Sequence, residues 1–144
     1  MIIDTTYILP LAGIGVKHDL LRAIAESKVK GITLRDLKIS LISLFEMQAK
    51  AAKLGVPPER VFRAARAIMK GLTVIPFYNK EIIRKAHELR KTINDYIDCT
   101  IVATAITLKE DLATEDRLIH EHAAIIEKEH GIKIKNYKQL INKT

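Results

Sequence analysis

The sequence contains a single cysteine, no tryptophan and no long apolar run. One cysteine, Cys99, excludes a disulfide within the chain, which fits a reducing compartment. No apolar stretch approaches the roughly 18 residues that span a bilayer, and no basic segment followed by an apolar one indicates a secretory signal. We therefore expect a soluble, cytoplasmic protein that does not associate with a membrane.

Several enzyme motifs are missing as well. The glycines of residues 13–15 lack the third glycine of a dinucleotide fingerprint, and there is no Walker A lysine motif. A haloacid-dehalogenase-like phosphatase requires an aspartate two residues after Asp4, where this chain has Thr6. His120 and His122 are two residues apart, so on a helix they point to different sides and do not easily share one metal ion.

Length and charge limit the class of protein. A chain of 144 residues fits one domain, 1–144, with one core. The net charge of +7 favours a polyanionic partner, although plain solubility explains a lysine-rich chain almost as well. Heavy use of Lys, Glu and Ile resembles that of a thermophile's protein.

Short apolar segments alternate with amphipathic ones along the chain. We expect strands or extended segments at 1–5, 38–42, 72–75, 112–114 and 132–134. We expect helices at 16–27, 43–54, from Pro57 onward, 79–92, 96–108 and 116–129, with a last turn at 137–141. This alternation predicts an α/β fold with a mostly parallel sheet and helices on both faces.

Four separated acids stand beside these apolar segments: Asp4, Glu46, Asp98 and Asp116. In a parallel α/β fold, residues at strand ends and helix starts gather at the carboxyl edge of the sheet. Gathered carboxylates repel each other unless a divalent cation neutralises them. The sequence therefore predicts a magnesium or manganese site and an enzyme that acts on phosphates.

Each acid also has a purely structural explanation. The acids that follow the first and fourth strands suit helix caps. Ser43 and Glu46 have the spacing of a capping box, which is the more common reason for such a pair. Asp95 and Asp98 stand in one helical turn, which is more than capping requires, so one of them is left for another role. Only the joint placement of the acids favours a shared site.

The order of these motifs resembles that of the PIN-domain family, of the VapC toxin kind. The resemblance rests on Ile3-Asp4-Thr5-Thr6, on Glu46 in a helix after a strand, on Asp98 through Ala103-Thr104-Ala105, and on Thr114-Glu115-Asp116. It implies an α/β/α sandwich with a short parallel sheet. It also implies a metal-dependent ribonuclease that is commonly a homodimer and is often held inactive by a cognate antitoxin.

The resemblance further assigns roles to individual residues. It implies that Asp4, Glu46, Asp98 and Asp116 bind Mg²⁺ or Mn²⁺, and that the hydroxyls of Thr6 and Thr114 orient carboxylates or a metal-bound water. Asp95 is a second candidate beside Asp98. An antitoxin of this family is expected to fill the acidic cleft with its C-terminal segment.

Basic and aromatic side chains are candidates for contacts with RNA. Arg63, Arg66 and Lys70 recur at helical spacing, and Arg84 and Lys91 are expected to share a face of the next helix, although a solvated surface is the more common explanation for any one of them. Tyr7 and Tyr78 are candidates for base stacking, although a buried or capping tyrosine is more common.

Three functions remain open from the sequence. The first is a metal-dependent endoribonuclease that cleaves single-stranded or looped RNA. The second is an RNA- or ribosome-associated binding module with the same fold and weak cleavage. The third is a metal-dependent phosphatase or a nuclease acting on DNA. The complete set of four acids favours the enzyme.

Overall fold

The computed structural model describes residues 1–141, so the last three residues of the predicted domain 1–144 lie outside the described part. Five parallel strands form one sheet in the order β3-β2-β1-β4-β5. The strands are β1 (Ile2–Ile3), β2 (Lys38–Ser40), β3 (Thr73–Ile75), β4 (Leu112–Ala113) and β5 (Ile134–Lys135). The predicted α/β class and the parallel sheet are confirmed.

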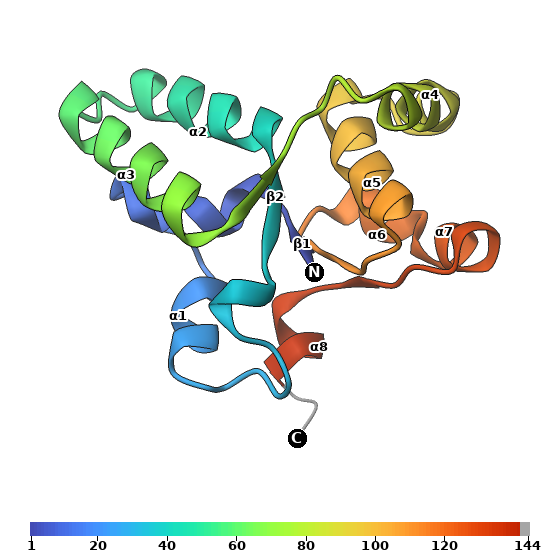
Figure 1. The fold of residues 1–144 in the computed structure, drawn as a ribbon, viewed down its shortest axis with the longest axis horizontal. Coiled ribbons are helices and arrows are strands. Elements are labelled where there is room, and N and C mark those ends of the chain that lie inside the picture. Colours follow the sequence, from blue (N-terminus) through green and yellow to red (C-terminus); the bar gives the residue numbers. More distant parts are fainter. Residues whose placement is uncertain (142–144) are drawn as a thin grey trace.

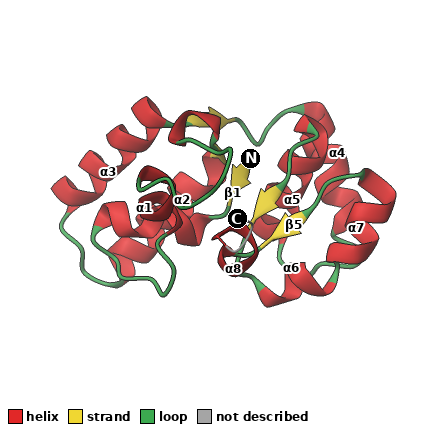
Figure 2. Cartoon of the chain, turned by 90° about the horizontal axis from the view of Figure 1, so that it is seen from below, coloured by secondary structure: helices red, strands yellow, loops and turns green. Residues whose placement is uncertain are grey.

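Helices cover both faces of this sheet, as Figures 1 and 2 show. They are α1 (Leu20–Ala25), α2 (Leu41–Lys53), α3 (Pro58–Gly71), α4 (Lys80–Leu89), α5 (Tyr96–Leu108), α6 (Arg117–Glu121), α7 (Ala123–His130) and α8 (Tyr137–Ile141), with 3₁₀ helices η1 (Thr5–Ala12) and η2 (Leu34–Asp36). Within residues 1–141, no helix combines the length and apolar character needed to cross a membrane.

Alternation along the strands divides the core between the two faces. Ile3 and Ala113 pack into a core with α2 and α3, whereas Ile2 and Leu112 pack into a second core with α5, α6 and α7. Successive side chains of a strand point to opposite faces, so two neighbouring apolar residues supply both cores. All four of these side chains are completely buried. Strands of only two residues therefore suffice to anchor the sheet between its helical layers.

Three details of the helices differ from the sequence expectations. The helix expected at 16–27 is shorter and begins at Leu20, because the side chain of Asp19 caps it by accepting from the N–H of Arg22 at 3.1 Å. The helix expected at 116–129 is interrupted at His122, which separates α6 from α7. The predicted cap at Ser43 is wrong.

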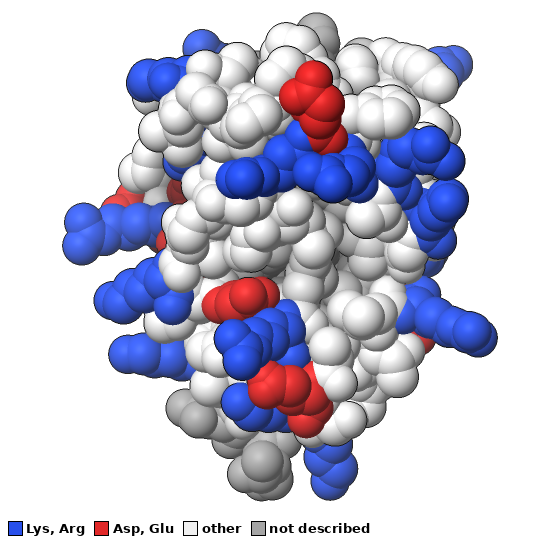
Figure 3. Space-filling model, turned by 90° about the vertical axis from the view of Figure 1, so that its left-hand side faces the viewer, with Lys and Arg blue, Asp and Glu red and all other residues white. Residues whose placement is uncertain are grey.

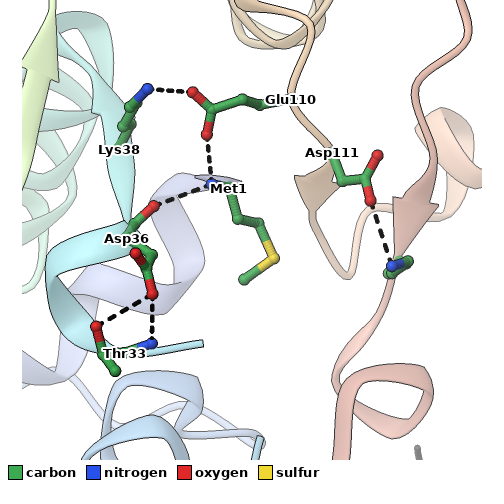
Figure 4. Close-up of polar contacts among 7 residues, drawn as sticks. Met1, Thr33, Asp36, Lys38, Glu110 and Asp111 are labelled. Atoms are coloured by element: carbon green, nitrogen blue, oxygen red, sulfur yellow. Dashed lines mark hydrogen bonds and ion pairs between the residues drawn. The ribbon is translucent and has the colours of Figure 1, made fainter. Parts of the chain in front are cut away.

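The amino edge of the sheet is held by ion pairs (Figure 4). The carboxylate of Glu110 pairs with the Lys38 ammonium and, at 2.5 Å, with the N-terminal ammonium of Met1. That ammonium also donates to the carbonyl of Asp36 at 3.0 Å. Burial opposes ionisation of Glu110, but the bonds from these two cations outweigh burial and lower its pKa. Acids at this edge are therefore neutralised by the chain itself.

Candidate active site

The four predicted acids meet at the opposite, carboxyl edge of the sheet. They line one cavity of about 350 Å³ together with Thr5, Thr6, Leu9, Phe45, Ala49, Lys50 and Ile97. Asp4 directly follows β1, and Asp116 lies three residues after the end of β4. Glu46 comes from the second turn of α2, and Asp98 comes from the first turn of α5. Residues far apart in sequence are thus brought together by the parallel sheet.

Asp4 is held at the floor of this cavity by two hydrogen bonds. Its Oδ1 accepts from the N–H of Thr5 at 2.7 Å, and its Oδ2 accepts from the hydroxyl of Thr114 at 2.5 Å. Burial raises the pKa of Asp4, and the two hydrogen bonds only partly oppose this effect. Asp4 also caps η1, so the cap and the cavity use the same side chain.

Glu46 is positioned by a contact that the sequence did not reveal. The predicted capping box is absent, because Ser40 caps α2 through Ile42 and Ser43 is buried inside the helix. The hydroxyl of Thr5 instead donates to Oε1 of Glu46 and lies 2.9 Å from the hydroxyl of Ser43. Burial, followed by the nearby charge of Asp4, raises the pKa of Glu46.

Thr5 is therefore a site residue that sequence reasoning missed. The resemblance directed attention to its neighbour Thr6, which also lines the cavity and whose expected role stays a prediction. The contact between Thr5 and Glu46 joins residues 41 positions apart. No local pattern in the sequence indicates such a pairing.

Asp95 and Asp98, which lie in the same helical turn, have different roles: one caps the helix and the other lines the cavity. Asp95 is the cap of α5, since its side chain accepts from the N–H of Asp98 at 3.1 Å. Asp98 lines the cavity instead. Burial raises the pKa of Asp98 to about 7, and the negative charges of Asp116, Asp95, Asp4 and Glu46 act in the same direction. This acid experiences the combined charge of the whole cluster.

Thr114 joins the two acids that follow the central strands. Its hydroxyl donates to Asp4, and its oxygen accepts from the N–H of Asp116 at 3.0 Å. Asp116 in turn caps α6, where its Oδ1 accepts from the N–H of Ile119 at 3.0 Å. A single buried hydroxyl thus links the carboxylate of Asp4 to the backbone of Asp116.

Glu115, the residue between Thr114 and Asp116, holds this loop in place through two hydrogen bonds. Its Oε2 accepts from the hydroxyl of Tyr7 and, at 2.7 Å, from the N–H of Tyr137. Tyr7 is completely buried, and burial is the main cause of its raised pKa. Tyr7 is therefore part of the core and is not available for base stacking, whereas Tyr78 is exposed.

The predicted basic residues lie outside the cavity. Arg63, Arg66 and Lys70 are exposed on α3, and their contact with RNA stays a prediction. Arg84 forms ion pairs with both Glu81 and Glu88 on its own helix. The expectation that Arg84 and Lys91 share a helix face is wrong, because α4 ends at Leu89.

The donor atoms of the cavity suit a hard divalent cation. Carboxylate and hydroxyl oxygens are the ligands that Mg²⁺ and Mn²⁺ prefer. Within residues 1–141, no three His, Cys, Asp or Glu side chains are close enough to surround an ion directly. Mg²⁺ usually keeps several waters and contacts one or two carboxylates, so acids spread around a cavity fit such an ion through water. Burial is the main cause that raises the pKa values of Asp4, Glu46 and Asp98, and the negative charges of neighbouring acids add to it. A bound cation would oppose both effects.

Comparison with protein families identifies the fold. The family model of the PIN domain matches residues 1–125, which include all four acids. The chain belongs to the PIN-domain family. PIN domains are generally nucleases, and these nucleases generally use divalent metal ions. None of the curated proteins is similar enough to this PIN domain to count as a relative.

Solved structures show the same fold at low sequence identity. A chain of a toxin–antitoxin complex from Klebsiella pneumoniae has a TM-score of 0.59 and 19% identity, covering 91% of this chain and 93% of that chain. A chain in the structure of FitAB bound to an IR36 DNA fragment has a TM-score of 0.64 and 18% identity, covering 95% of each chain. The first neighbour thus belongs to a toxin–antitoxin complex, and the second belongs to a complex bound to DNA. At such identities the likeness concerns the fold.

Proposed function

We propose that this PIN domain is a Mg²⁺- or Mn²⁺-dependent endoribonuclease that cleaves single-stranded or looped RNA. The observation that carries the proposal is the convergence of Asp4, Glu46, Asp98 and Asp116 on one cavity at the carboxyl edge of the sheet. Family membership supports nuclease chemistry. The net charge of +7 supports a polyanionic substrate, whose phosphates basic side chains attract without reading sequence.

The residues of the cavity divide the work. Asp4, Glu46, Asp98 and Asp116 would hold the cation, which supplies an activated water and neutralises charge on the phosphate. Thr114 orients Asp4 and Asp116, and Thr5 orients Glu46. These hydroxyls keep the carboxylates in place while the cation and substrate exchange.

The biological setting is part of the same proposal. The fold neighbours support a toxin that pairs with a cognate antitoxin, whose basic residues would face the acidic cavity. We also propose that residues 1–144 form one nuclease domain, that the protein works as a homodimer and that it acts in the cytoplasm. The homodimer follows from the family resemblance, whereas the single domain and the cytoplasmic location follow from the length and composition of the sequence.

The decisive experiment measures cleavage of a labelled single-stranded RNA with Mg²⁺, with Mn²⁺ and with EDTA. Wild type should cleave only with metal, and Asp98→Asn should lose at least about 100-fold in rate because it removes a carboxylate from the metal site. The protein must be shown to be folded and free of antitoxin. Cleavage that survives Asp98→Asn would contradict the assigned site.

A single-stranded DNA of the same sequence provides the second arm of this experiment. Preferred cleavage of the DNA would replace the ribonuclease with a DNA-directed nuclease. Binding of RNA without cleavage under either metal would instead indicate a binding module.

A further inference from the structure

A group of exposed aromatic side chains lies beside the acidic cavity. Phe45 is 62% exposed although it immediately precedes Glu46 in α2. Its ring lines the acidic cavity and also a neighbouring apolar groove of about 420 Å³, which is formed with Leu41, Ile42, Leu44, Gln48 and Phe77. The groove is thus continuous with the candidate active site through one side chain.

Two more exposed rings lie in one short segment, and one of them, Phe77, lines this groove. Phe77 is 38% exposed and Tyr78 is 65% exposed, and their ring centroids lie 5.8 Å apart at a tilt of 36°. Both residues lie in the segment that joins β3 to α4, which crosses from one helical layer to the other above the carboxyl edge in Figure 1. This segment passes the start of α2, because Phe77 shares the groove with residues of α2.

We infer that Phe45, Phe77 and Tyr78 form a stacking surface for the bases of single-stranded RNA next to the scissile phosphate. This inference rests on the proposed function and specifies which form of the substrate the site takes. A base has two apolar faces and stacks on aromatic rings without regard to its sequence. In a duplex these faces are already covered, so a stacking surface selects unpaired nucleotides.

Charge around the rings fits a nucleic acid better than a purely apolar occupant. Lys50 lines the acidic cavity one helical turn beyond Glu46, and Lys80 is exposed two residues after Tyr78. Figure 3 shows the side of the molecule that α2 and α3 cover, where the blue Lys and Arg side chains are more prominent than the red Asp and Glu side chains. Cations beside aromatic rings form the usual combination of single-strand binding proteins.

The test compares two phenylalanines that are equally exposed. Phe62 on α3 is also 62% exposed, but it lines a different cavity, together with Val56, Val61 and Ala65. Phe45→Leu and Phe62→Leu are each placed in the inactive Asp98→Asn background. Binding of an unstructured RNA oligonucleotide and of a perfect RNA duplex is then measured by fluorescence anisotropy.

Phe45→Leu should weaken binding of the single strand by about 5- to 100-fold, the range expected for loss of stacking on one base. Phe62→Leu should leave this affinity unchanged, and Phe45→Trp should preserve it. The duplex should bind equally to all variants. The slope of affinity against salt concentration should be the same for Phe45→Leu as for its parent, because stacking releases no counterions. Tyr78→Leu should show the same pattern.

Two results would overturn the inference. The first is an unchanged single-strand affinity in Phe45→Leu and Tyr78→Leu, whether or not the variants also lose self-association by analytical ultracentrifugation. If self-association were lost, the rings would belong to an interface between two copies. The second is an equal loss of affinity in Phe62→Leu.

Failure of this inference can be distinguished from failure of the proposed function. If cleavage requires Asp98 but substitution of Phe45 does not change RNA binding, only the stacking surface is contradicted. If RNA binding requires Phe45 but no metal-dependent cleavage is observed, only the proposed nuclease activity is contradicted.

Discussion

Acidic side chains lie at both edges of the same parallel sheet, but their pKa values are shifted in opposite directions at the two edges. At the amino edge, Glu110 faces Lys38 and the N-terminal ammonium of Met1, which lower its pKa (Figure 4). At the carboxyl edge, burial and, after it, the charges of neighbouring carboxylates raise the pKa values of Asp4 and Asp98. Glu110 at the amino edge is paired with two cations of the chain, whereas the four acids of the proposed active site share one lysine, Lys50, among the residues that line the cavity.

This difference indicates where function is located. An unpaired buried charge is destabilising, so a cluster of acids without matching cations is a candidate functional site. The hydroxyls of Thr5 and Thr114 orient the cluster but add no positive charge to it. Under the proposed function, the carboxyl edge should therefore depend on a cation, whereas the amino edge should not.

The largest difference between the two edges should appear in the cleavage rate of the Thr114→Val variant. The substitution keeps the shape of the side chain but removes the hydroxyl that joins Asp4 to Asp116. We expect cleavage to fall by about 10- to 100-fold, as for other residues that orient metal ligands. Metal titrations of the cleavage rate should show a higher midpoint, and Thr114→Ser should restore both values.

Thr104→Val is the matched control for this prediction. Thr104 is equally buried, but its hydroxyl donates to a carbonyl within α5 at 2.8 Å and contacts none of the acids. A similar loss of activity in both variants would show that Thr114 acts only through general stability.

The next effect belongs to the amino edge and concerns stability. Glu110→Gln should lower the free energy of unfolding by about 2 kcal/mol at pH 7, because it leaves the Met1 ammonium without its carboxylate. The pKa of Glu110 is lowered, so this contribution is present above its ordinary value of 4.5 and is lost as pH falls through the folded value. Urea denaturation of wild type and Glu110→Gln at pH 7 and at pH 3 measures the loss of stability and its dependence on pH.

Cleavage by folded Glu110→Gln should remain unchanged, which sharpens the contrast with the carboxyl edge. Loss of activity without loss of stability would mean that the two edges are coupled, contrary to the division described above.

Much of the site was predictable because its signals are local. Asp4 and Asp116 follow short buried strands, and the parallel sheet then brings strand ends to one edge without further information. The choice of Asp98 over Asp95 agrees with the observed cap geometry. The sequence order of strands and helices likewise predicted the layered α/β fold.

The rest depends on contacts between distant parts of the chain. Ser43 and Glu46 have the spacing of a capping box, but Ser40 takes the cap because α2 begins directly after β2. Tertiary packing then places Thr5 beside Glu46 and Tyr7 against Glu115. Periodicity also fails to separate buried from exposed rings, since Phe45 and Phe62 both sit in helices with apolar patterns yet face solvent.

The smallest predicted effect is a gain in stability when an acid of the candidate active site is replaced by its amide. In the folded protein the pKa of Asp98 is about 7, above its ordinary value of 3.8, so the folded state binds more protons than the unfolded state between these two values. The free energy of unfolding of the metal-free protein should therefore fall as pH rises from about 4 to about 7. Asp98→Asn removes this penalty and should stabilise the metal-free protein at pH 8, by roughly 1 kcal/mol after solvent screening of a half-buried group.

Urea denaturation in EDTA at pH 5 and pH 8 measures this effect for wild type and Asp98→Asn. The variant should gain more stability relative to wild type at pH 8 than at pH 5, whereas Glu110→Gln should lose stability at both. Added Mg²⁺ or Mn²⁺ should stabilise wild type more than Asp98→Asn, since a ligand that binds only the folded state raises its stability. If the variant were less stable than wild type at pH 8 without metal, the charge of Asp98 would be compensated by the chain itself, and the contrast between the two edges would disappear.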